Sequence, residues 1–252
     1  MLRKSTSASL KIRLKIHNTQ RRGGNIFPPF LFMAIHLSPR LLAAAALVPV
    51  GSDVIDVGTD HAKLPVYLVQ NGIARHVWAC DIHAGPLENA RSLVRAEGLE
   101  DRIGLRLTDG LHGFSRADAD TVTITGMGGE TIVDILAAAP WVHENVVLVL
   151  GPHTKMAECR RWLCVNGFTI DAETLVEDAG RIYPLFTAVS GTPVEYTTAE
   201  YHSGLFSALR RHPLFADYLD RLIARASAAA PYNAEEAVLC RDYITMKENL
   251  SS

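Results

Sequence analysis

Long apolar runs, paired cysteines and a dinucleotide-binding glycine loop are all missing from this sequence. No apolar run reaches the ~18 residues that a membrane span needs, and the run from Phe27 to Phe32 is interrupted by Pro28 and Pro29. The four cysteines have no CxxC spacing and no histidines at zinc-finger intervals. The sequence therefore predicts a cytoplasmic protein with reduced thiols, no membrane span and no metal site.

Acidic residues are missing from the first 33 residues, which contain seven lysines or arginines. A basic head of this kind is typical of a transit peptide or a nucleic-acid-binding arm. A third interpretation takes Met33 as the true start, because amphipathic helical spacing begins just after it. We treat residues 1–32 as a disordered or spurious basic extension and exclude them from the fold.

The rest of the chain has the composition of a globular protein. Of the 252 residues, 48% are hydrophobic and 21% charged, which is enough for a proper core in one domain with an appendage. From Ser38 onward, strand-like apolar runs alternate with helical patterns. The expected strands are 54–57, 76–80, 103–107, 121–125 and 145–150, and the expected helices are 39–48, with Ser38 as its N-cap, 64–71, 86–97, 131–139 and 155–166.

This alternation predicts βαβ units in an α/β, doubly wound and mostly parallel sheet. Two further strands, 168–176 and 181–188, are joined by "EDAG" and predict a closing antiparallel hairpin. That variant of the Rossmann-like sheet is typical of class I methyltransferases. After Pro193, apolar residues at three- and four-residue spacings predict a helical appendage; they are Leu205, Leu209, Leu214, Phe215, Tyr218, Leu219, Leu222 and Ile223.

Polar residues and glycines follow four consecutive predicted strands. In open α/β sheets, ligands bind beyond the carboxyl ends of the strands, so these residues predict a ligand site. They are Asp56, Gly58, Thr59, Asp60 and His61 after the first strand, Asp81 after the second, Asp109 and Gly110 after the third, and Gly126, Met127, Gly128 and Gly129 after the fourth.

The chemistry of the first loop favours a cationic ligand over a dinucleotide. Only Gly58 is present where a GxGxxG loop needs three glycines, and Asp60 and His61 occupy the space of a diphosphate. A carboxylate repels a diphosphate but attracts a sulfonium and an α-amino group. We therefore expect S-adenosylmethionine rather than NAD, with Asp56 and Asp60 at its methionine end. Asp81 would accept from the ribose hydroxyls and Asp109 from the adenine amino group.

Several motifs resemble the bacterial tRNA (adenine-22 N1)-methyltransferase family, from about Leu37 to Phe215. They are "LSPRL" (Leu37–Leu41), "DVGTDHAKLP" (Asp56–Pro65), "DGL" (Asp109–Leu111), "GMGG" (Gly126–Gly129), "RRWL" (Arg160–Leu163) and "EDAGRIYPL" (Glu177–Leu185). The resemblance implies a methyltransferase domain over residues 33–192 and a helical region over 193–252. It also implies S-adenosylmethionine contacts at Asp56, Gly58, Asp60, His61, Asp81, Asp109, Gly110, Gly126 and Met127, to which we add the neighbouring Thr59 and Gly128.

One loop departs from the family pattern. The family usually offers a polar amide beyond a proline after the fifth strand, whereas this chain has Gly151, Pro152 and His153. A neutral imidazole can donate or accept one hydrogen bond. His153 is therefore a candidate for orienting the target adenine, although it is not equivalent to an amide.

The resemblance implies methylation of adenine N1 in tRNA. N1 carries a lone pair, so we expect no essential general base, and the base must be unpaired or extruded to be reached. Because the chain after the basic head is acidic overall, phosphate contacts must come from local patches. The candidates for substrate binding are Arg40, His153, Arg160 and Arg161. No oligomeric state is predicted.

Three alternatives remain open from the sequence. The same fold could methylate another RNA or a small molecule, or it could bind S-adenosylmethionine without catalysis, which the altered loop at His153 would fit. An NAD-dependent oxidoreductase is the third, and the missing glycines and Asp60 argue against it.

Overall fold

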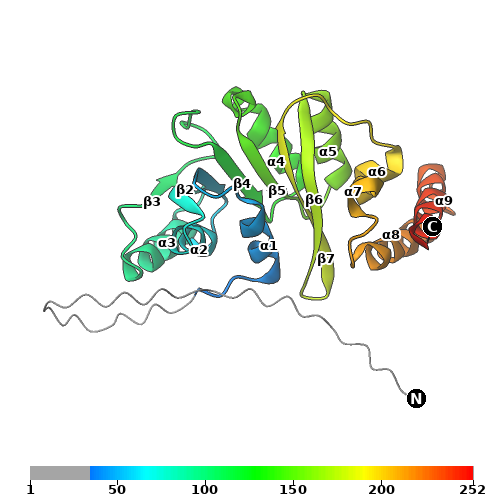
Figure 1. The fold of residues 1–252 in the computed structure, drawn as a ribbon, viewed down its shortest axis with the longest axis horizontal. Helices are drawn as coiled ribbons and strands as arrows, with labels where there is room; N and C mark the ends of the chain where they lie inside the picture. Colours follow the sequence, from blue (N-terminus) through cyan, green and yellow to red (C-terminus); the bar gives the residue numbers. More distant parts are fainter. Residues whose placement is uncertain (1–34, 252) are drawn as a thin grey trace, which may run out of the picture. The chain divides into compact units, whose positions relative to one another are not determined.

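The computed structural model describes residues 35–251, and the predictions for residues 1–32 lie outside that range. A seven-stranded sheet runs through this part of the chain (Figure 1), in the order β3-β2-β1-β4-β5-β7-β6. Strands β1 to β5 pair in parallel, and β7 is antiparallel to both β5 and β6. This arrangement confirms the predicted Rossmann-like sheet with a closing antiparallel hairpin. The strands are β1 (Ser52–Val57), β2 (Ala74–Asp81), β3 (Ile103–Leu107), β4 (Thr121–Thr125), β5 (Val147–Gly151), β6 (Phe168–Asp178) and β7 (Arg181–Ser190).

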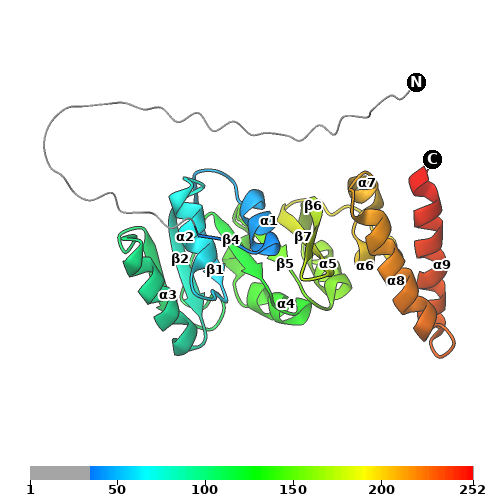
Figure 2. The same cartoon turned by 90° about the horizontal axis from the view of Figure 1, so that it is seen from below.

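Helices cover both faces of the sheet. Helices α1, α2 and α3 pack on one face in one apolar cluster, and α4 and α5 pack on the other face in a second cluster; Figure 2 shows α1 and α4 on opposite sides. The helices are α1 (Pro39–Leu47), α2 (Lys63–Gln70), α3 (Ala84–Ala96), α4 (Gly129–Ala137), η1 (Pro140–His143), α5 (Met156–Val165), α6 (Thr198–Ser203), α7 (Phe206–Leu209), α8 (Phe215–Ala229), α9 (Ala234–Glu248) and η2 (Asn249–Ser251).

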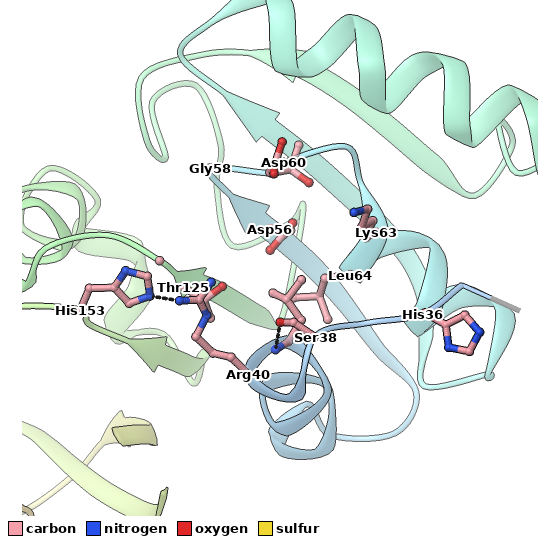
Figure 3. A pocket seen from close by; sticks show the side chains of 13 residues that line it. His36, Ser38, Arg40, Asp56, Gly58, Asp60, Lys63, Leu64, Thr125 and His153 are labelled. Atoms are coloured by element: carbon pink, nitrogen blue, oxygen red, sulfur yellow. Dashed lines mark hydrogen bonds between the residues drawn. The ribbon is translucent and has the colours of Figure 1, made fainter. Parts of the chain in front are cut away.

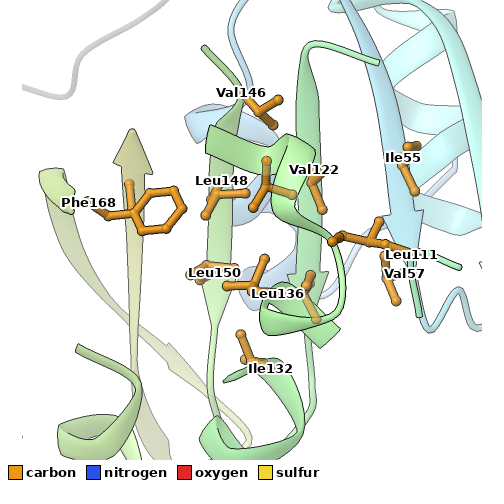
Figure 4. Packing of buried hydrophobic residues seen from close by; sticks show 14 of the residues in the cluster. Ile55, Val57, Leu111, Val122, Ile132, Leu136, Val146, Leu148, Leu150 and Phe168 are labelled. Carbon is orange, nitrogen blue, oxygen red and sulfur yellow. The ribbon is translucent and has the colours of Figure 1, made fainter. Parts of the chain in front are cut away.

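The core under α4 explains why the central strands are almost continuously apolar. Val122 of β4 and Leu148 of β5 are fully buried, and they lie in the same cluster as Ile132 and Leu136 of α4 (Figure 4). A strand that is covered on both faces has no solvated side for polar residues. Apart from Thr123 in the middle of β4, polar groups of the central strands are therefore concentrated at their ends, and the carboxyl ends form the ligand edge.

The closing hairpin turns over two residues, Ala179 and Gly180, whose φ angles are 49° and 74°. Two consecutive positive φ values are typical of the tight turn that matches the twist of a hairpin. The strands consequently continue to Asp178 and resume at Arg181, so they are longer than the sequence pattern predicted. Helix α4 also begins earlier than predicted, at Gly129, whose N–H has no acceptor within the helix and donates to the Thr154 carbonyl at 2.8 Å.

The C-terminal helices pack on the hairpin rather than on the central strands. Leu175 of β6 and Ile182 of β7 share an apolar cluster with Phe215, Leu219 and Tyr243. The apolar residues that the sequence places at helical spacing after Pro193 therefore serve mainly to pack these helices on the hairpin. The domain boundary that the sequence analysis places between residues 192 and 193 stays a prediction.

A buried ion pair connects α5, β6 and α6. The Arg160 side chain is 0% exposed and that of Glu173 3%, with 3.4 Å between Arg160 Nε and Glu173 Oε1. Arg160 Nη1 donates to the Tyr201 carbonyl at 3.0 Å, and the Tyr196 hydroxyl donates to Glu173 Oε1 at 2.9 Å. The prediction that Arg160 contacts tRNA is wrong, because its guanidinium is enclosed by protein and bound to internal partners.

We expect Arg160→Met to lower the free energy of unfolding by about 3–5 kcal/mol, because it leaves the Glu173 carboxylate buried without a countercharge. Denaturant unfolding measures this loss. The matched control is Arg161→Met at the exposed neighbouring position, which should cost less than about 1 kcal/mol. Adding Glu173→Gln to Arg160→Met should recover much of the loss. Equal losses for Arg160→Met and Arg161→Met would contradict the assignment of a buried ion pair between Arg160 and Glu173.

Candidate active site

A cavity of about 400 Å3 opens at the carboxyl ends of β1 and β4 (Figure 3). The start of α1, the loop into α2 and the loop after β5 complete its wall. The lining residues are His36, Ser38, Arg40, Leu41, Asp56, Gly58, Thr59, Asp60, Lys63, Leu64, Thr125, Gly126 and His153. The structure therefore gathers seven of the residues predicted from the sequence; they are Arg40, Asp56, Gly58, Thr59, Asp60, Gly126 and His153.

Asp56 is a buried carboxyl group at the floor of this cavity. Its side chain comes from the inner strand β1, and the residue is 5% exposed. The Thr123 hydroxyl on β4 donates to Asp56 Oδ1 at 2.6 Å. Burial raises the pKa of Asp56 to about 6, against the opposing effect of this hydrogen bond. A carboxylate held in an apolar floor strongly attracts a cation.

The loop after β1 packs closely against the side chain of Met127 in the loop after β4. Gly58 has φ of +74°, and a Cβ at this position would lie 2.2 Å from Met127 Cε. Thr59 is 2% exposed, and its Oγ1 lies near Asp56 and lowers the pKa of that carboxyl, but it makes no hydrogen bond of regular geometry within the described part of the chain. A buried hydroxyl without a partner is uncommon in folded proteins, and a ligand in the cavity can supply the missing bond.

The same loop carries backbone strain. His61 and Ala62 both have positive φ, at 59° and 51°, which is uncommon for residues other than glycine and least favourable here for Ala62. The His61 ring lies 3.2 Å from Asp60 Oδ1, and the two side chains are 47% and 83% exposed. His61 does not line the cavity; it flanks Asp60 at the mouth.

Asp81 and Asp109 lie at the neighbouring strand ends, outside the cavity. Asp81 Oδ1 accepts from the His83 backbone N–H at 2.7 Å. Asp109 is exposed, and Gly110 is buried with φ of +54°, where a Cβ would meet Ile135 at 2.9 Å. Both carboxylates thus occupy the same sheet edge as Asp56.

The glycine loop after β4 lies against the loop after β5. Gly126 has φ of +86°, and a Cβ on Gly128 would lie 3.1 Å from Thr154 Oγ1. Met127 is half-buried and packs on the apolar cluster below α4. Met127 and Gly128 therefore support the cavity wall from behind, whereas Gly126 lines it.

The opposite wall of the cavity is basic. Arg40 Nη1 lies 2.5 Å from His153 Nε2, and Figure 3 shows this pair across the cavity from Asp60. Burial lowers the pKa of His153, and the charges of Arg40 and Arg181 lower it further. Arg161 lies away from the cavity, exposed on α5, with its guanidinium 4.9 Å from the centre of the Tyr201 ring.

Six lining residues were missed by the sequence analysis: His36, Ser38, Leu41, Lys63, Leu64 and Thr125. Thr125 ends β4, so the rule about strand ends could have found it. His36 and Ser38 precede α1, and no local signal connects them with β1 or β4. Only the packing of α1 on the sheet brings them to this edge.

Other kinds of site find no support in residues 35–251. No group of three or more His, Cys, Asp or Glu side chains there could hold a metal ion, and none of its helices is long and apolar enough to cross a membrane. All four cysteines are free. The sheet order and the carboxylate at its ligand edge define a class I methyltransferase.

Comparisons with known proteins agree with this class. The methyltransferase domain family matches residues 37–186. The tRNA (adenine(22)-N(1))-methyltransferase of Bacillus subtilis is 35% identical over 158 residues, which is 62% of this chain and 66% of that protein. Streptococcus pneumoniae Sp1610, described as a putative tRNA (m1A22) methyltransferase, superposes with a TM-score of 0.76 at 31% identity, covering 85% of this chain and 99% of that one. M. capricolum TrmK in complex with S-adenosyl-homocysteine gives 0.73 at 26% identity, covering 85% and 98%.

The chain belongs to the bacterial tRNA (adenine-22 N1)-methyltransferase family, which confirms the resemblance seen in its motifs. S-adenosylmethionine is the cofactor of such an enzyme, and the residues of the cavity fit it. The buried Asp56 suits a cationic ligand, and the buried hydroxyl of Thr59 can donate a hydrogen bond to it.

We expect S-adenosylmethionine to bind more weakly below about pH 6. The cationic cofactor favours ionised Asp56, whose pKa is about 6 in the free protein. Below that pH, binding must release a proton, so affinity falls by up to about tenfold per pH unit. Calorimetric titration at several pH values between about 5 and 8 measures this, and a flat profile for the wild-type protein would contradict it.

Asp56→Asn should stabilise the free protein and remove the part of this pH dependence that comes from Asp56. Because burial raises the pKa of Asp56, its ionisation costs stability as the pH rises from the unfolded value of about 4 through about 6. The amide removes that cost and still accepts from Thr123. We expect a gain of about 1–2 kcal/mol at pH 7 in thermal unfolding, with weaker cofactor binding. A lower melting temperature would count against a buried carboxylate.

Proposed function

We propose that this protein transfers the methyl group of S-adenosylmethionine to N1 of adenine 22 of tRNA. The observation that carries the proposal is the cavity itself. It places the buried carboxyl of Asp56 at its floor and the Arg40–His153 pair on its wall, at the ligand edge of a methyltransferase sheet. Membership of the family supports the choice of acceptor. We also propose a cytoplasmic location, where tRNA is modified.

The reaction requires the protein to position the methyl group and adenine N1 rather than to transfer a proton. When bound, S-adenosylmethionine supplies an electrophilic methyl group on a sulfonium. Adenine N1 is a neutral nucleophile with a free lone pair, so no general base is needed, and alignment with exclusion of water lowers the barrier. Because N1 lies on the Watson–Crick edge, the adenine must leave its stack to enter the cavity.

Each carboxylate at a strand end binds a different part of the cofactor. Asp56 and Asp60 attract the ammonium and sulfonium groups, Asp81 accepts from the ribose hydroxyls, and Asp109 accepts from the adenine amino group. Asp81 keeps Oδ2 for this purpose, because His83 uses Oδ1. Backbone and small groups complete the pocket; they are Gly58, Thr59, Gly110, Gly126 and Gly128, with His61 flanking Asp60 and Met127 behind Gly58.

The tRNA approaches from the basic side of the cavity. His153 lines the wall next to Gly126, where it can orient the target adenine. Arg161 is exposed on α5 and available to a phosphate. Residues 33–192 would then act as the catalytic domain, and the helical residues 193–252 would lie beside it.

The test is methyl transfer from labelled S-adenosylmethionine to unmodified tRNA transcripts, followed by nucleoside analysis. We expect N1-methyladenosine with a transcript that has adenine at position 22, and none when that adenine is replaced by guanine. Arg91→Met, on the exposed outer side of α3, is a matched control that should retain activity. Cofactor binding without transfer to any tRNA would refute the proposal and leave a different acceptor or a non-catalytic binding protein.

A further inference from the structure

Arg40 and His153 make a contact that fixes the protonation of the imidazole. Arg40 Nη1 lies 2.5 Å from His153 Nε2. A guanidinium has donors and no acceptor, so Nε2 accepts this bond and the ring proton is on Nδ1. The imidazole is therefore neutral. In agreement, burial and the charges of Arg40 and Arg181 lower the pKa of His153.

Tyr183 holds the same guanidinium from another direction. The Arg40 guanidinium carbon lies 5.0 Å from the centre of the Tyr183 ring, and the His153 ring centre is 5.1 Å from that of Tyr183. The three residues come from α1, the loop after β5 and β7, which are far apart in the sequence. The charged and titratable groups around His153 are thus Arg40 on α1, and Arg181 and Tyr183 on β7.

Arg40 retains donors that the protein does not use. Within residues 35–251 its guanidinium hydrogen-bonds only His153, and its Nε is buried without any acceptor. Arg40 nevertheless lines the cavity (Figure 3). A buried donor without a partner is unfavourable, so an acceptor is expected from a ligand. A guanidinium edge fits an oxyanion best, because two parallel donors can face its two oxygens.

We infer that His153 is a positioning residue, which together with the ring of Tyr183 holds Arg40 so that its remaining donors bind an oxyanion of a ligand in the cavity. This inference rests on the proposed function, which brings two such oxyanions to the site. One is the carboxylate of the methionine part of the cofactor, and the other is a phosphate of the tRNA. The role of His153 is then to support Arg40, in addition to any contact with the base.

Two binding measurements on Arg40→Met distinguish the two oxyanions. If the carboxylate is bound, affinity for S-adenosylhomocysteine falls by about ten- to a hundredfold, while affinity for methylthioadenosine, which lacks the carboxylate, is unchanged. If a phosphate is bound, both small ligands bind as before, and the tRNA dissociation constant and KM rise by a similar factor. Arg91→Met is the matched control. Unchanged binding of all three ligands would overturn the inference.

Substitutions of His153 test the positioning role separately. In His153→Gln the amide oxygen can accept from Arg40 and cannot be protonated, so we expect binding close to wild type at about pH 8. On acidification this variant should lose less affinity than wild type, because only the loss due to Asp56 remains. His153→Leu should lose binding as Arg40→Met does, at every pH. If Gln and Leu behave alike, His153 does not act through Arg40.

The tautomer of His153 is a readout independent of activity. Nitrogen-15 NMR of the ring should show an unprotonated Nε2 in the wild-type protein, and Arg40→Met should raise the pKa of His153. A proton on Nε2 would overturn the inference. Because these readouts and ligand binding require no turnover, a wild-type protein without N1-methyladenosine product would refute the proposed function alone.

Discussion

The parallel pairing of β1 with both β2 and β4 is the constraint on which the site depends. Parallel register brings the carboxyl ends of these strands to one edge, so Asp56 lies beside Thr123 and receives its hydrogen bond at 2.6 Å. The same pairing encloses both edges of β1 and helices cover both faces of the sheet, which is why the Asp56 carboxyl is buried. The position of Asp56 at the floor of the cavity and its burial therefore both follow from its place on an inner strand of the sheet.

Burial of Asp56 lowers the stability of the free protein and strengthens the binding of a cation. The apolar surroundings that raise its pKa to about 6 also make the ionised group a strong partner for a cation. Arg40 shows the corresponding feature on the opposite wall, because its buried Nε has no acceptor within the described chain. Unsatisfied Thr59 Oγ1 completes the pattern. A site with unpaired polar groups of both signs fits a zwitterionic ligand better than it fits an empty state.

Sequence reasoning succeeded where the signal was local and failed where it was not. Glycines and acids after strands identified Asp56, Gly58 and Gly126, because strand ends can be read from apolar runs. The error at Arg160 has the opposite origin. The motif around it suggested an exposed basic pair, but Glu173, which neutralises Arg160 inside the protein, lies 13 residues away on another element and gives no local signal.

The sequence by itself determined the alternation of strands and helices, the chemical type of the edge and the family motifs, because these depend on periodicity and on residues close together in the chain. Only the tertiary structure decided which polar groups share one cavity. Packing of α1 on the sheet delivers Arg40 and Ser38, and the antiparallel insertion of β7 delivers Tyr183 beside His153. The contact of Arg40 with His153 joins residues 113 positions apart, and the geometry of such contacts is fixed by the packing of whole elements rather than by any local pattern.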